Sequence, residues 1–167
     1  SSSDEAALIA RSRERLAGHF GTPPEGWLSP WISESDRTPD LLQEAGFAYT
    51  LNWAHDDRPV AMRTRHGQLL SIPYPQELND IPTISTHRVS MNEFATMMRD
   101  QFLELLEQSC HQPLVMGIAL HPWLTGQPFR LRLLRKVLSD LAGYRESEGV
   151  WWTTPGAIAR HVAKQAV

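Results

Sequence analysis

A histidine follows an uninterrupted apolar run in the second half of the chain. Seven consecutive apolar or small residues, Leu114 to Leu120, are followed directly by His121 and Pro122. Such a run predicts a strand buried on both faces, as in a parallel sheet. Because Pro122 cannot continue a central strand, His121 is expected at the carboxyl end, where α/β proteins collect ligands and catalytic groups. Two interpretations stay open: a functional histidine, or one satisfied by a nearby backbone group.

Other chemical signatures are sparse. The densest cluster of metal-capable side chains is His55-Asp56-Asp57, which suits a solvated acidic turn after a strand better than a metal site. The seven histidines include no H-x-x-x-H pair, although zinc hydrolases usually present closely spaced ligands. Neither a nucleotide-binding glycine loop nor a G-x-S-x-G nucleophile elbow occurs.

Tryptophans are frequent, with six in 167 residues. Four of them fall at expected strand ends or in loops: Trp27, Trp31, Trp53 and Trp123. A flat apolar face with one hydrogen-bond donor suits a sugar ring or a small heterocycle. Ordinary burial of large rings is the alternative, and for Trp151 and Trp152 it explains the residues at least as well as ligand binding does.

The elements that would position these residues alternate along the chain. Residues 47–53 form a second expected strand, and residues 60–65 and 68–72 suit a hairpin or two short strands. Ser90-x-x-Glu93 is a capping box that begins a helix of about five turns. This alternation predicts an α/β fold with mainly parallel strands and helices outside the sheet.

Length and composition predict one domain over residues 1–167. The net charge of −3 favours neither nucleic acid nor an acidic membrane surface as a partner. Cys110 is the single cysteine, which excludes an internal disulfide and a site with several thiolates. With no apolar run of about 20 residues and no secretory signal, the sequence predicts a cytoplasmic protein.

Several short motifs occur together in a characteristic order. They are Gly26-Trp27-Leu28-Ser29-Pro30, Leu51-Asn52-Trp53 with Asp56-Asp57-Arg58-Pro59, Pro73-Tyr74-Pro75 with Asn79-Asp80, and Leu120-His121-Pro122 followed by Gly126-Gln127-Pro128-Phe129-Arg130. Together they resemble the polysaccharide deacetylase (NodB-homology) superfamily, and within it the allantoinase-like branch.

This resemblance implies a distorted (β/α) barrel of about seven strands, which hydrolyses an N-acetyl group on a sugar or a related C–N bond with the help of a metal. It implies that His121 is the general acid and that Leu120 lines the acyl pocket. Trp53 would line the substrate site, and Trp27 and Pro30 would shape the substrate groove.

The family's aspartate pair and two-histidine motif precede the matched motifs and are not in this sequence. We therefore expect the C-terminal part of such a barrel, without a metal site or cofactor in this chain. The resemblance allows a divalent metal such as zinc in the complete family protein.

Strand carboxyl ends share one face of a barrel. Asp57, Asn79 and Asp80 are accordingly expected near the same mouth as His121, where they would orient polar substrate atoms or brace loops rather than bind a metal.

The sequence thus favours part of a hydrolase of non-peptide C–N bonds, acting on a small-molecule or sugar substrate in carbohydrate metabolism. The alternative is a truncated or degenerate barrel without catalytic activity, which binds a small polar or sugar-like ligand. An incomplete sheet leaves an open edge, so we expect association with the missing N-terminal half or self-association into oligomers.

Overall fold

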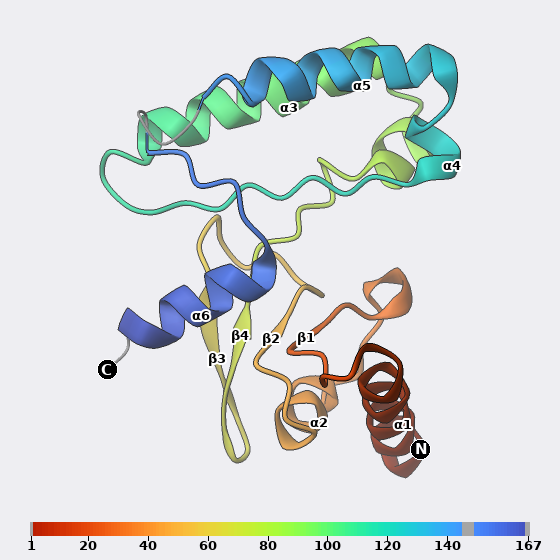
Figure 1. Cartoon of the computed structure of the whole chain (residues 1–167), viewed down its shortest axis with the longest axis vertical. Coiled ribbons are helices and arrows are strands. Elements are labelled where there is room, and N and C mark those ends of the chain that lie inside the picture. The colour runs from red at the N-terminus through yellow and green to blue at the C-terminus, as the bar shows by residue number, and fades with distance from the viewer. Residues whose placement is uncertain (1, 145–148, 166–167) are drawn as a thin grey trace. The chain divides into compact units, whose positions relative to one another are not determined.

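The computed structural model describes residues 2–144 and 149–165, which divide into two compact units (Figure 1). The first unit comprises residues 1–73 together with 153–167, and the second comprises residues 74–152. Each unit has its own hydrophobic core. The expectation of a single domain over residues 1–167 stays a prediction.

The first unit has a four-stranded mixed sheet with the strand order β1-β2-β4-β3. Its strands are β1 (Gly26–Trp27), β2 (Tyr49–Thr50), β3 (Val60–Thr64) and β4 (Gly67–Ser71). β1 pairs in parallel with β2, and β2 in parallel with β4. β3 and β4 form an antiparallel hairpin.

Helices accompany this sheet in the same unit. They are α1 (Ser2–Phe20), α2 (Thr38–Glu44) and α6 (Pro155–Gln165), together with the short helix η1 (Pro30–Ile32). Gly21 ends α1, since it adopts a φ of 76° and its N–H donates to the Ala17 carbonyl. The core of this unit joins α1, α2 and the sheet through Ile9, Leu41, Leu42, Phe47 and Leu69.

The second unit is helical. It contains the π-helical turn η2 (Ile81–Thr86), α3 (Met91–Gln108), α4 (Pro122–Thr125) and α5 (Pro128–Leu141). α3 and α5 lie side by side (Figure 1) and share the core of this unit. The predicted capping box is confirmed: the Ser90 hydroxyl accepts from the Glu93 N–H, and the Glu93 carboxylate accepts from the Ser90 N–H.

The expected strand over Leu114–Leu120 is wrong. The segment is extended, but only Ala119 makes a β-bridge, and residues 114–118 and 120 are half-buried. A strand is stabilised by hydrogen bonds to its neighbours, and in this segment Ala119 makes such bonds, to Leu78 and Asp80. Apolar composition therefore marks partial burial here, not a central strand. The strand expected over residues 47–53 is also shorter, because only Tyr49 and Thr50 pair as β2.

The predicted α/β class is confirmed, and the sheet is mixed: two of its three strand pairings are parallel, as expected, and the pairing of β3 with β4 is antiparallel. Two residues, Arg65 and His66, connect β3 to β4, and so short a connection can join only antiparallel strands. Closure into a barrel stays a prediction. In the described part of the chain, no helix combines the length and apolar character needed to cross a membrane.

Candidate active site

A backbone bridge brings Asp80 beside His121, although 41 residues separate them. The Ala119 N–H donates to the Leu78 carbonyl at 2.9 Å, and the Asp80 N–H donates to the Ala119 carbonyl at 3.1 Å. Asn79 and Ala119 thereby pair in parallel. The Asp80 side chain is 0% exposed, so its carboxylate depends on hydrogen bonds from the protein.

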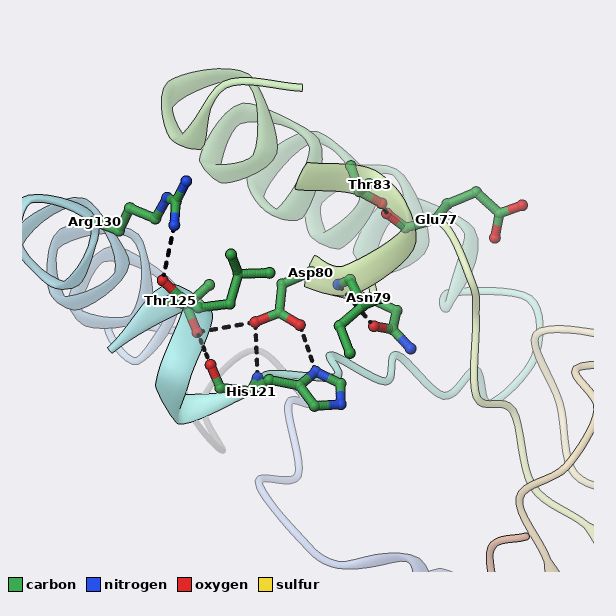
Figure 2. Close-up of polar contacts among 9 residues, drawn as sticks. Glu77, Asn79, Asp80, Thr83, His121, Thr125 and Arg130 are labelled. Carbon is green, nitrogen blue, oxygen red and sulfur yellow. Dashed lines mark hydrogen bonds and ion pairs between the residues drawn. The ribbon is translucent and has the colours of Figure 1, made fainter. Parts of the chain in front are cut away.

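The His121 residue supplies two of these hydrogen bonds (Figure 2). Its backbone N–H donates to Asp80 Oδ2 at 2.7 Å, and its ring Nδ1 lies 2.6 Å from Asp80 Oδ1. Because an ionised carboxylate can only accept, Nδ1 must carry the hydrogen. The second ring nitrogen, Nε2, is then the one that can exchange a proton with a ligand, and the side chain is 34% exposed.

Thr125 supplies the third donor to the buried carboxylate. Its hydroxyl lies 3.0 Å from Asp80 Oδ2 and 3.2 Å from the His121 carbonyl, so the charged acceptor is also the nearer one (Figure 2). Three donors compensate the loss of water around Asp80, and hydrogen bonds to a charged acceptor are stronger than neutral ones. The result is a fixed imidazole with one nitrogen bonded to the interior.

The short helix α4 positions both partners of Asp80. His121 is its N-cap residue and Pro122 its first residue, and the N–H groups of Leu124 and Thr125 both donate to the His121 carbonyl. One helical turn thus places Thr125 over His121. The sequence interpretation missed Thr125, although proline directly after His121 is a signal for a helix start and predicts this spacing.

Neighbouring contacts brace the site. Arg130 Nη1 donates to the Leu124 carbonyl at 3.2 Å, which ties α5 to α4, and the Thr83 hydroxyl donates to the Glu77 carbonyl at 2.7 Å (Figure 2). Burial, and secondarily the charge of Asp80, raise the pKa of Tyr74 above its usual value. Tyr74 is therefore a neutral phenol at physiological pH.

Two further predicted site residues adjoin the Asp80–His121 pair. Asn79 is 9% exposed, and its Oδ1 accepts from the Ile81 N–H at 3.1 Å, so it braces the start of η2. Leu120 is half-buried and packs against the core of the second unit. A direct role for either in binding substrate stays a prediction.

The other predicted site residues lie in the first unit. The Trp27 indole N–H donates to the Ser29 hydroxyl at 2.7 Å, and its ring packs edge-on against Phe47. Pro30 begins η1, Trp53 is 50% exposed after β2, and Asp57 is exposed in the following turn. Whether these four share a site with His121 stays a prediction.

A buried asparagine organises the ends of β1 and β2 in that unit. Asn52 is 0% exposed; its Oδ1 accepts from the Ser29 N–H at 2.8 Å, and its Nδ2 donates to Glu34 at 2.7 Å. The sequence interpretation included Asn52 in a motif but gave it no role. Its partners are 18 and 23 residues away, so no local pattern indicates them.

Residues 2–144 and 149–165 contain no set of side chains that could bind a metal ion. No three side chains of His, Cys, Asp or Glu are grouped there so as to hold an ion. The residues described therefore do not fit the divalent metal that the resemblance allows in a complete protein. What they offer is an oriented histidine.

Comparisons with known proteins point to one superfamily. No protein-family model matches the chain. It is 36% identical over 94 residues to a Schizosaccharomyces pombe protein described as "Putative polysaccharide deacetylase", and 24% identical over 194 residues to the peptidoglycan deacetylase of Helicobacter pylori. These matches cover 55% and 96% of this chain, but only 28% and 64% of the two relatives.

A solved structure extends the similarity to the fold. The crystal structure of PuuE allantoinase superposes with a TM-score of 0.86 at 26% identity, covering 96% of this chain and 53% of that one. The chain thus spans less than two thirds of these proteins and corresponds to a C-terminal portion of them. The resemblance predicted from the motifs is confirmed: the relatives are named as deacetylases and an allantoinase.

Proposed function

We propose that this chain is the C-terminal part of a NodB-type barrel hydrolase of non-peptide C–N bonds, in which His121 is the general acid. The observation that carries the proposal is the buried Asp80 carboxylate, which is bonded to His121 Nδ1 and so leaves Nε2 as the other ring nitrogen of a side chain that is 34% exposed. The names of the relatives support the reaction class.

The reaction needs a proton where the C–N bond breaks. Water adds to the acyl carbon, the C–N bond breaks, and its electron pair remains on the departing nitrogen, which takes a proton from His121 Nε2. The products are a carboxylic acid and an amine. Histidine suits this step because it ordinarily titrates near neutrality, and a positioned acid contributes about 10² to 10⁴ in rate.

Asp80 serves this step by positioning the ring and by stabilising its cation. With Nδ1–H directed at a carboxylate, protonation at Nε2 gives an imidazolium beside a negative charge. Asp80→Asn removes that charge. We therefore expect a lower kcat in this variant.

The test uses the complete protein, with an N-acetylated amino sugar and a cyclic amide as substrates. His121→Ala should lower kcat by about 10² to 10⁴ with an unchanged circular dichroism spectrum. His66→Ala is the matched control, because His66 lies in the connection between β3 and β4 and its side chain is 65% exposed. Turnover in His121→Ala equal to that of the control would refute the assignment.

We also propose that β1 pairs with further chain, either the missing N-terminal half or a second copy. In the described sheet β1 has β2 as its single neighbour, and the residues that follow include exposed Leu28 and Trp31. An edge with little charge favours pairing. Light scattering on the 167-residue chain, alone and with the N-terminal half added, tests this: a chain that stays monomeric under both conditions would contradict it.

A further inference from the structure

An exposed tryptophan stands next to the proposed acid. The Trp123 side chain is 60% exposed, and the centroid of its ring lies 6.2 Å from that of His121, with the two planes inclined by 57°. Large aromatic side chains usually contribute most when they are covered. Here the indole remains open to solvent beside the ring that would deliver a proton.

The backbone beneath this indole is firmly fixed. α4 is closed by hydrogen bonds to the His121 carbonyl from Leu124 at 2.9 Å and Thr125 at 3.0 Å, and both of those side chains are buried. The turn also requires a glycine at its end, since a Cβ on Gly126 would lie 2.1 Å from the Pro122 carbonyl oxygen. The exposure of Trp123 is therefore imposed by the fold of α4.

The same hydrogen bonds couple Trp123 to the acid. Thr125, two residues later in this turn, donates to Asp80, and Asp80 holds the His121 ring. The Gln127 side chain donates to the Trp123 carbonyl at 3.1 Å, which ties the next turn to it. Indole and imidazole are thus carried by one short, braced element, and their relative position is set before any ligand arrives.

We propose that Trp123 is a specificity-determining residue: its indole stacks against a ring in the substrate and so presents the nitrogen attached to that ring to His121. A stacked ring lies about 3.5–4 Å from the indole face. Because the centroids of the imidazole and the indole lie 6.2 Å apart, a nitrogen attached to the stacked substrate ring can reach hydrogen-bond distance of His121 Nε2. This inference rests on the proposed function. It predicts that the protein prefers amides that bear a ring over open-chain amides.

The experiment compares two probes in the complete protein, an N-acetylglucosamine trimer and an acyclic N-acetylated amine. For the trimer, Trp123→Ala should raise KM by about tenfold, whereas Trp123→Phe should retain most of the affinity. For the acyclic amine, neither variant should alter KM. Phe20→Ala is the matched control, because Phe20 is an exposed aromatic residue on α1.

Equal effects on both probes, or no effect on either, would overturn the proposal while leaving the role of His121 intact. When turnover is absent, titration calorimetry with the trimer tests stacking by Trp123 independently of the role of His121 as an acid. Affinity that falls about tenfold in Trp123→Ala, but not in Phe20→Ala, would support stacking even if His121 proved not to be an acid. Unchanged affinity would overturn it.

Discussion

Replacement of Asp80 by alanine is the sharpest test of the arrangement around His121. The carboxylate is fully buried and accepts from the His121 N–H, from His121 Nδ1 and from the Thr125 hydroxyl. The alanine variant removes the acceptor of all three hydrogen bonds at once. The donors it leaves behind differ in how well they can find other partners.

The magnitude follows from those differences. The Thr125 hydroxyl can turn to the His121 carbonyl at 3.2 Å, and the ring of His121, being 34% exposed, can reach water. The His121 N–H loses its acceptor outright, which costs about 1–3 kcal/mol. With about 1 kcal/mol from the lost hydrogen bond between His121 Nδ1 and the carboxylate, we expect a loss of about 3 kcal/mol in the free energy of unfolding.

Urea denaturation followed by circular dichroism measures this loss, and hydrogen exchange in α3 and α5 localises it to the second unit. With an m-value of about 2 kcal/mol per molar, the midpoint should fall by about 1.5 M. Asp57→Ala is the matched control, because Asp57 is an exposed aspartate whose truncation should change stability by less than about 0.5 kcal/mol. A loss in Asp80→Ala no larger than in the control would refute the reasoning.

Three further outcomes are expected. Gly26→Ala should lower stability by about 1–3 kcal/mol, because the new Cβ would lie 2.1 Å from Tyr49 Cζ. Gly18→Ala is its control and should be neutral or stabilising, because no atom lies within 4 Å of the new Cβ. Thermal unfolding measures both variants. Ser90→Ala should cost about 1 kcal/mol in urea denaturation, since it removes the N-cap of α3, and an unchanged midpoint would contradict this. Burial, and secondarily the Asp80 carboxylate, raise the pKa of Tyr74 in the folded protein. The stability that the neutral phenol contributes is therefore present below pH 10 and is lost as the pH rises above it. Tyr74→Phe should lose less stability than the wild type between pH 9 and 11.

Local signals in the sequence predicted local structure well. The capping box at Ser90 and Glu93 predicted where α3 begins, because its two hydrogen bonds span only three residues. The hairpin over β3 and β4 is one of the two arrangements, a hairpin or two short strands, that the sequence left open for these segments. The ordered motifs, taken together, also predicted the superfamily that the comparisons support.

Contacts between distant segments could not be predicted in this way. The run Leu114–Leu120 has the composition of a central strand, yet a strand exists only where neighbouring backbone is aligned with it, and Ala119 alone is bridged. Trp123 was one of four tryptophans expected at strand ends or in loops that could contact a ligand ring. Its distance from the His121 ring, which only the structure gives, distinguishes it from the others.

The sequence alone determined that His121 ends an apolar segment and that Pro122 cannot continue a central strand. It left open whether the ring serves chemistry or is satisfied by the backbone. The tertiary structure decided that the partner of Nδ1 is the buried Asp80 carboxylate, with Thr125 as a further donor. The physical reason is that burial of a charge depends on which donors converge on it in space, and these donors come from segments more than 40 residues away along the chain.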